Sequence, residues 1–161
     1  MRLTRDRGWK TLMIRIASNT DVAKIVALMQ SVPGFWRDDW RTDAVARGIA
    51  AGGNLACVWD ENHEILGFVC AHDLGFRAYL SELVVAKHAQ KRGIGRRLLQ
   101  HVQAQLASRG CTVLVSDVWK DARRFYESLG WTPPDVVLLR KELSGGNRQQ
   151  SDQSGDRTTD N

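Results

Sequence analysis

The segment from Tyr79 to Arg109 constrains the fold of this chain more than any other stretch. Its first part, residues 79–85, is apolar and rich in β-branched residues, which predicts a strand. Its last part repeats apolar residues at helical spacing, which predicts an amphipathic helix: Ile94, Leu98, Leu99, Val102 and Leu106. Gly93 and Gly95 lie between the two, where glycine lets the backbone approach a ligand closely. The segment therefore predicts an α/β fold with a binding turn between a strand and a helix.

The charges around this turn favour an anionic ligand. No Asp or Glu occurs between Leu83 and Ser116, whereas six residues of the wider segment are cationic: Lys87, Lys91, Arg92, Arg96, Arg97 and Arg109. The first turn of a helix also presents unpaired amide N–H groups, which bind anions. The pattern is neither a Walker A loop nor the dinucleotide fingerprint, which would need a third glycine at Leu98. A tight turn with solvated arginines remains the alternative to a phosphate site.

A second motif lies downstream, from Ala122 to Trp131, with the sequence ARRFYESLGW. Together with the turn at residues 90–95, it resembles the paired motifs of the GNAT superfamily of N-acetyltransferases, with Trp131 in place of the usual Phe. The resemblance covers residues 13–143. It implies the GNAT fold, a mixed and mostly antiparallel sheet with helices on both faces. It also implies acetyl-coenzyme A as cosubstrate.

The domain organisation follows from composition. With 161 residues, 43% hydrophobic and 25% charged, the chain has the size and composition of one globular domain. We expect a basic N-terminal extension at residues 1–12, the acetyltransferase domain at 13–143, and a disordered tail at 144–161, which contains no hydrophobic residue. Three widely spaced cysteines and the lack of an apolar leader favour a cytoplasmic protein without a membrane segment. The four histidines show no metal-ligand spacing, so we expect no metal.

Hydrophobic patterning predicts the order of elements. Strands are expected at residues 12–16, 55–60, 65–72, 78–85, 112–118 and 136–139. Helices are expected after the capping residues 19–21 and at residues 42–51, 94–109 and 121–129. A short turn at residues 61–63 predicts an antiparallel hairpin. The strand–helix–strand unit after it predicts one parallel pair.

Amide formation from a thioester needs a base for the amine and a proton donor for the leaving thiolate. Tyr126 lies where the second motif of the family carries a tyrosine beside the coenzyme sulfur, so the resemblance implies that it is the acid. Glu82, on the central strand, matches a position where family members often carry an acid and is our candidate base. Alternation along a strand places it opposite Leu83. His72 and Asp117 are weaker candidates, and a purely structural role stays open for each of these residues.

The resemblance also implies which residues contact the coenzyme. The backbone of Leu83, Val84 and Val85 would bind the pantetheine arm, and an N–H of Leu83 or Val84 would polarise the carbonyl oxygen. The pyrophosphate would lie against the turn and the start of the helix, at Lys91, Arg92, Gly93, Ile94, Gly95 and Arg96. The chain departs from the family pattern at Trp119, where many members carry an Asn that binds the arm.

The predicted function is direct transfer of an acetyl group from acetyl-coenzyme A to a primary amine of a small molecule or of a protein. No cysteine lies in either motif, which argues against a covalent acyl-enzyme. A non-catalytic coenzyme A binding or sensing module is the alternative. The net charge of +5 also admits a nucleic-acid binder, but we expect neither nucleic acid nor a membrane as partner. Asp38 and Asp39 are candidates to attract a cationic acceptor, and a homodimer stays open.

Overall fold

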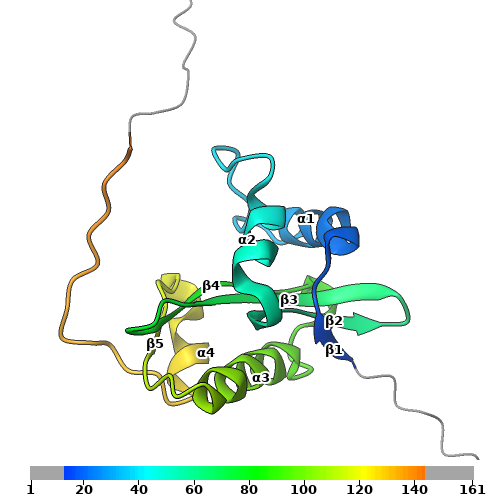
Figure 1. Cartoon of the computed structure of the whole chain (residues 1–161). Helices are drawn as coiled ribbons and strands as arrows, with labels where there is room; N and C mark the ends of the chain where they lie inside the picture. The colour runs from blue at the N-terminus through cyan, green and yellow to red at the C-terminus, as the bar shows by residue number, and fades with distance from the viewer. Residues whose placement is uncertain (1–12, 144–161) are drawn as a thin grey trace, which may run out of the picture.

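The computed structural model describes residues 13–143, and the predicted N-terminal extension and C-terminal tail lie outside them. One five-stranded sheet forms the centre of the molecule, in the order β1-β2-β3-β4-β5 (Figure 1). Its strands are β1 (Ile14–Ile16), β2 (Ala56–Glu61), β3 (Glu64–Asp73), β4 (Ala78–Val85) and β5 (Leu114–Val115). All neighbours are antiparallel except β4 and β5, which are parallel. The predicted mixed, mostly antiparallel sheet is therefore confirmed.

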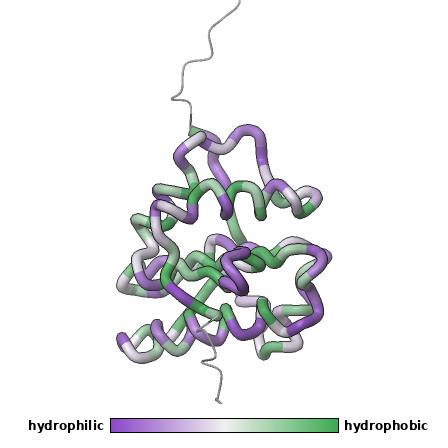
Figure 2. Tube along the Cα trace, turned by 90° about the vertical axis from the view of Figure 1, so that its right-hand side faces the viewer, coloured by the Kyte–Doolittle hydropathy of each residue, from purple (hydrophilic) through white to green (hydrophobic). Residues whose placement is uncertain are grey.

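Helices cover both faces of this sheet, as the sequence predicts. Helices α1 (Val22–Ser31) and α2 (Ala44–Gly52) lie on one face, and α3 (Ile94–Ser108) and α4 (Arg123–Glu127) lie on the other (Figure 1). Hydrophobic and hydrophilic residues alternate along these helices, so that each can turn an apolar side toward the strands (Figure 2). Short 3₁₀ turns at residues 19–21, 53–55, 87–89 and 120–122 connect the elements.

The hydrophobic core is centred on β3, whose residues from Ile65 to Ala71 are all buried. Phe68 on this strand is among the largest fully buried side chains. Gly67 lets α3 approach the sheet closely, because an added Cβ would meet Leu98 Cδ1 at 2.8 Å and Ile94 Cγ2 at 3.0 Å. The hairpin between β2 and β3 turns on Asn62 and His63, both with positive φ, as tight two-residue hairpin loops require. These contacts fix β4 in the middle of the sheet.

An ion-pair network fixes the first strand and helix to the sheet. Arg15 on β1 donates to both carboxylate oxygens of Asp21, at 2.8 Å each, and to Asp60 on β2 at 2.8 Å. Asp21 also accepts a hydrogen bond of 2.8 Å from the backbone N–H of Ser18, just before α1. Arginine and these hydrogen bonds hold the pKa of the buried Asp21 carboxyl well below its ordinary value.

Two predicted strands differ from the structure. The strand expected at residues 112–118 is reduced to β5, because only Leu114 and Val115 pair with β4. The strand expected at residues 136–139 is wrong for the single chain, where this segment is extended but makes no strand pairing with another described residue. Both errors have one physical reason, since a strand needs a neighbouring edge and the sequence does not say where that edge lies.

Candidate active site

A groove of about 490 Å³ lies between the end of β4, the start of α3, and α4. Seven of the nine residues predicted to bind the coenzyme line it: Leu83, Val85, Lys91, Gly93, Ile94, Gly95 and Arg96. Tyr126 and Leu129 of the second motif form part of the opposite wall. The fold thus brings the two sequence motifs together across one groove.

The turn before α3 has the backbone geometry of an anion site. Lys91 and Gly93 both have positive φ, 63° and 81°, which bends the chain sharply before the helix. The first backbone N–H bonded into the helix is that of Arg97, which donates to the carbonyl of Gly93 at 3.1 Å. The amides of Ile94, Gly95 and Arg96 precede it and are the orphan donors of the first turn. With Lys91 and Arg96 in the wall, these donors fit a pyrophosphate.

Two predicted coenzyme contacts lie outside the groove lining. Val84 is buried and pairs with Phe68, on the side of the sheet that carries α1 and α2. The guanidinium of Arg92 is ion-paired with Glu61 at 2.7 Å. Their contacts with the coenzyme stay predictions, but the structure does not direct either side chain into the groove.

The gap between β4 and β5 opens immediately beyond the last paired residues. The two strands pair only at Ala78 with Leu114 and Tyr79 with Val115. The Ser116 hydroxyl then donates to the carbonyl of Leu80 at 2.9 Å, and no strand among the described residues pairs with this edge of β4 after that point. Backbone N–H and C=O groups of β4 are therefore free to bind an extended ligand arm.

A β-bulge in β4 places the candidate base. Leu80 pairs with Ala71 and Glu82 pairs with Cys70, so Ser81 is an extra residue with no partner in the ladder. The Ser81 hydroxyl donates to the carbonyl of Cys70 at 3.1 Å. Bulges redirect side chains, and here the bulge puts Glu82 at the boundary of two cavities, of about 410 and 700 Å³. The sequence carries no signal for this bulge.

Glu82 lies in an environment that suits a base at neutral pH. Burial raises the pKa of its carboxyl to about 7, and the nearby charge of Asp117 adds to the effect. Asp117 itself accepts a hydrogen bond from the hydroxyl of Tyr79 and lines the larger cavity. A carboxyl group with this pKa can accept a proton from an ammonium group and release it to water near pH 7.

Tyr126 lines both the larger cavity and the coenzyme groove. Its ring packs edge-on between Phe125 and Trp131, with both ring centroids 5.2 Å away. Burial and the charges of Glu82 and Asp117 raise the pKa of its hydroxyl to about 12. The hydroxyl is therefore protonated at neutral pH and can act as a proton donor where the two cavities meet.

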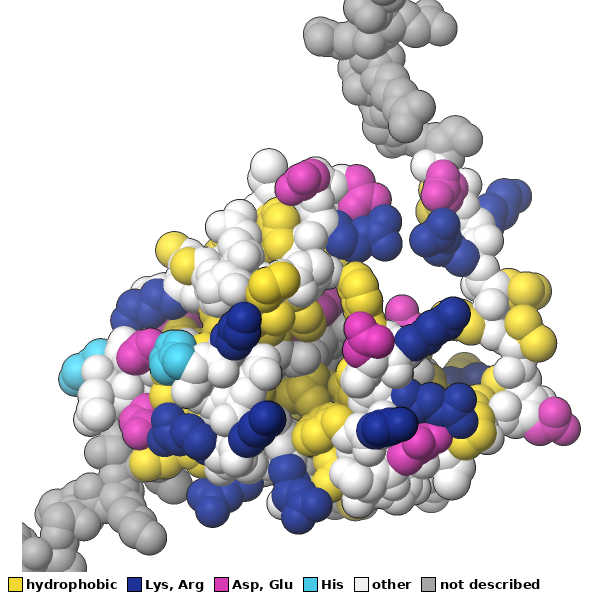
Figure 3. Space-filling view, turned by 180° about the vertical axis from the view of Figure 1, so that it is seen from behind, with side chains coloured by type: hydrophobic (Ala, Val, Ile, Leu, Met, Phe, Trp, Pro, Cys, Tyr) yellow, Lys and Arg dark blue, Asp and Glu magenta, His cyan; other side chains and the backbone are white. Residues whose placement is uncertain are grey.

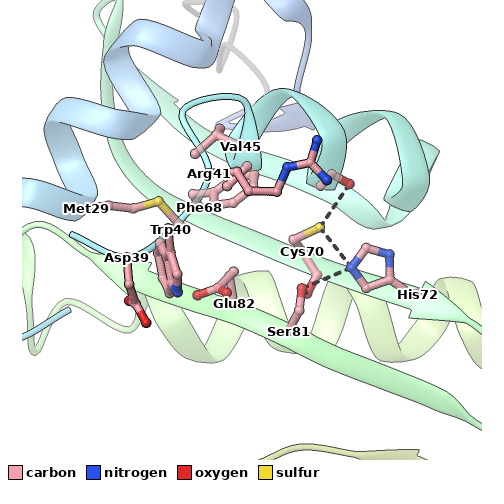
Figure 4. Close-up of a pocket in the computed structure, with 12 residues that line it drawn as sticks. Met29, Asp39, Trp40, Arg41, Val45, Phe68, Cys70, His72, Ser81 and Glu82 are labelled. Carbon is pink, nitrogen blue, oxygen red and sulfur yellow. Dashed lines mark hydrogen bonds between the residues drawn. The ribbon is translucent and has the colours of Figure 1, made fainter. Parts of the chain in front are cut away.

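The smaller cavity extends from Glu82 away from the coenzyme groove (Figure 4). Its walls come from the α1–α2 region and from β3, and they are mainly apolar and aromatic: Met29, Trp40, Val45 and Phe68. His72 lies at one side, where its Nε2 is 3.0 Å from the Ser81 hydroxyl. Asp39 also lines this cavity, but its carboxylate is ion-paired with Arg37 at 2.8 Å, and Asp38 is not among the lining residues.

From behind, the molecule shows a hollow with hydrophobic side chains on its floor and Lys and Arg side chains on its lower rim (Figure 3). Several lining residues were quoted in the motifs without a predicted role, among them Gln90, which donates to the carbonyl of Val85 at 3.2 Å. Others, such as Trp40 and Ser81, come from segments with no motif. Among residues 13–143, no three His, Cys, Asp or Glu residues are grouped so that they could hold a metal ion. None of the helices in this range has the length and apolar character needed to cross a membrane.

Comparison with known proteins identifies the architecture. The family model described as "Acetyltransferase (GNAT) family" matches residues 25–131, which include both motifs and both candidate catalytic residues. The chain belongs to the GNAT acetyltransferase family. The fold and the family that the sequence motifs predict are thereby confirmed.

Individual members of the GNAT family show how far the likeness extends. A 5-NmdU N-acetyltransferase of Pseudomonas phage PaMx11 is 32% identical over 77 residues, which cover 47% of this chain and 55% of that protein. This chain therefore matches only about half of that relative.

Solved structures share the fold at low sequence identity. The PaiA N-acetyltransferase of Thermoplasma acidophilum, in complex with coenzyme A, has a TM-score of 0.67 at 15% identity over 77% of this chain and 91% of that chain. A transcriptional regulator of Bacillus halodurans C-125 has a TM-score of 0.66 at 21% identity, covering 81% and 98%. These likenesses show the GNAT fold alone.

Proposed function

We propose that this protein is an N-acetyltransferase that transfers the acetyl group of acetyl-coenzyme A directly to a primary amine. One observation carries the proposal: Glu82 and Tyr126 line the same cavity, at the point where it joins the groove that holds the glycine turn. A base and an acid thus lie on either side of the place where an amine and a thioester would meet. A module that only binds the coenzyme would need neither group.

Acetyl-coenzyme A, when bound, supplies an acetyl thioester. On our proposal, the amides at the start of α3, together with Lys91 and Arg96, hold its pyrophosphate, and the open edge of β4 holds its arm. Glu82 accepts a proton from the ammonium group of the acceptor, because a simple alkyl amine is protonated at neutral pH. Tyr126 keeps its proton until pH of about 12 and donates it to the sulfur that leaves. A backbone N–H at Leu83 or Val84 polarises the carbonyl oxygen.

The acceptor enters from the cavity that Trp40 and Phe68 line. Its carboxylates attract a cationic amine, and its apolar walls favour a compact hydrophobic body next to that amine. The phage relative is named for an acceptor of the nucleoside type, and a primary amine on a planar ring is accordingly one acceptor to test first. The three cysteines are free thiols, which suits our further proposal of a cytoplasmic location.

The decisive experiment measures free thiol release from acetyl-coenzyme A with a panel of primary amines, including alkyl amines, aminomethyl aromatic compounds, amino acids and peptides. We expect Tyr126→Phe to lower kcat by roughly 10²–10⁴ while the affinity for coenzyme A, measured by calorimetry, is nearly unchanged. Binding of the coenzyme without turnover on any amine would instead support the sensing module. No binding of acetyl-coenzyme A at millimolar concentration would refute both.

A further inference from the structure

The segment from Thr132 to Leu143, here called the C-terminal arm, exposes an unusual run of apolar side chains. Its five large aliphatic residues are 72–87% exposed: Val136, Val137, Leu138, Leu139 and Leu143. The arm leaves the body after α4 and runs beside it as an extended chain (Figure 1, orange). From behind, its hydrophobic side chains are separated from the rest of the molecule (Figure 3, right side). Contiguous exposed apolar residues of this kind mark an interaction surface.

The arm also has the composition of a strand without a partner. Four consecutive residues, 136–139, are Val or Leu, and Val is among the residues enriched in strands. None of these four residues makes a backbone hydrogen bond with another described residue. An extended chain with free N–H and C=O groups is a template for pairing with a sheet edge.

The sheet offers one edge that matches this need. β5 is an edge strand of two residues, and beside it lies a groove of about 560 Å³, here called the β5 groove. The groove lies between β5, the end of α3 and the residues after α4, and its lining includes Leu106, Cys111, Val113, Leu114 and Trp131. Val113 is half-exposed on this edge. The β5 groove is thus an apolar trough next to an unpaired strand edge.

Two consecutive prolines decide which copy of the arm reaches the groove. Pro134 still lines the β5 groove, and Val136 follows only two residues later. Thr132 and Pro133 each precede a proline and are therefore held in extended backbone, and each proline has a fixed φ. Residues 132–134 form a stiff, straight connection, which carries the arm away from its own groove and disfavours a turn back onto it.

We propose that the arm of one copy of this chain adds as a strand to the β5 edge of a second copy, and that the second copy returns its arm to the first. A two-fold arrangement of this kind covers both exposed arms and both open edges by one repeated contact. β5 then gains hydrogen bonds on its free side, and the aliphatic side chains of the arm fill the β5 groove. The pairing would extend past Val115 to Ser116, the residue before Asp117 in the reaction cavity. The partner copy would thereby also support the active site.

The first test is the molar mass of the full chain in solution, by light scattering and sedimentation velocity from about 1 to 200 µM. We expect twice the 18.1 kDa of one chain. In the double variant Val137→Asp/Leu138→Asp we expect the mass of one chain, because neighbouring strand residues point to opposite faces and one charge meets the groove in either register. Phe76→Asp, which changes a side chain that is 97% exposed outside the arm, should leave the dimer intact. A wild-type monomer throughout this range, or a double variant that stays dimeric, overturns the proposal.

The second test separates exchange between copies from docking within one chain. Both engineered cysteines are placed in one chain, Val113→Cys and Leu138→Cys, in a Cys111→Ser background, and disulfide formation is followed by non-reducing electrophoresis. We expect a covalent species of two chains. A disulfide closed within one chain, or free thiols under oxidation, overturns the proposal even if a charged variant of the first test fails to fold, which circular dichroism would show.

Discussion

Glu82 combines three properties that rarely coincide in a strand residue. Its carboxyl group is largely buried, no hydrogen-bond partner among residues 13–143 satisfies it, and a second carboxylate, Asp117, acts on it electrostatically. Burial without a partner disfavours the charged form, which is why the pKa of the group lies near 7 rather than 4.5. Two measurements at the level of this residue follow.

The rate of acetyl transfer should depend on the ionisation of Glu82. We expect kcat/KM to rise about tenfold per pH unit below pH 7 and to bend near pH 7, where the carboxyl group loses its proton. The ionisation of the acceptor amine adds a second inflection at higher pH. In Glu82→Gln the bend near pH 7 should disappear and the rate should fall by roughly 10²–10⁴. A bend that persists in this variant would assign the titration to another group.

The same shift makes Glu82 costly for the fold. Because the pKa is higher in the folded chain than in the unfolded one, the carboxyl group contributes stability below pH 4.5 that is lost as the pH rises through about 7. We therefore expect Glu82→Gln to raise the free energy of unfolding at pH 8 by about 1–3 kcal/mol relative to its effect at pH 4. Urea unfolding at both pH values measures the difference. The exposed Glu64, changed to Gln, serves as control and should show little change between the two.

At the scale of the elements, the fold depends on how closely α3 approaches β3. Gly67→Ala would place a Cβ 2.8 Å from Leu98 and 3.0 Å from Ile94, so the helix must move. We expect this variant to lower the free energy of unfolding by about 1–3 kcal/mol, which denaturant titration would detect. Gly48→Ala is the matched control, since its nearest neighbour would be Cys70 Sγ at 3.9 Å. Equal stability of the two variants would contradict this account of the packing.

The elements also show where sequence reasoning succeeds. The central strand is predicted with its observed bounds, and α3 is predicted to within one residue at its end, because each has strong hydrophobic periodicity and a clear glycine signal. The two motifs are local in sequence, so their residues could be assigned to one groove from the pattern alone. Glu82 could be placed opposite Leu83 from strand alternation.

The remaining features depend on contacts that are not local. The bulge at Ser81 is a mismatch between β3 and β4 that neither strand shows by itself. The strand predicted at residues 136–139 has the right composition but no adjacent edge in its own chain. The aromatic wall of the acceptor-side cavity, with Trp40, comes from a loop whose path is set by packing on α2 and the sheet. Such features follow from the tertiary structure and could not be predicted from periodicity.

At the scale of the whole molecule, charge is divided between two sites. Lys91 and Arg96 line the groove of the glycine turn, whereas Glu82, Asp117 and Asp121 line the reaction cavity. On our proposal the first site binds a polyphosphate and the second an ammonium group, so each half of the binding region selects its own ligand by sign of charge.

Binding of coenzyme A should accordingly stabilise the whole domain. At a concentration 100 times the Kd, we expect a gain of about 2.7 kcal/mol, or roughly 5–10 °C in Tm by differential scanning calorimetry. Arg96→Ala should shift the required concentration upward at least several-fold. Arg97→Ala is the matched control on the same helix, because its guanidinium lies over the ring of Trp59, 5.8 Å from the ring centroid, and outside the groove. Equal losses in both variants would contradict the proposed pyrophosphate site.

The two-residue pairing between β4 and β5 has a consequence for how the molecule holds together. Two ladder pairs and one serine hydroxyl are few links for the junction between the first four strands and everything that follows them in the chain. A cosubstrate that bonds along the open edge of β4 would act as a sixth backbone in the sheet, so the protein without it is an unfinished architecture. Substrate occupancy would then govern how firmly the two halves of the enzyme adhere, and turnover would loosen and close the same seam in every cycle.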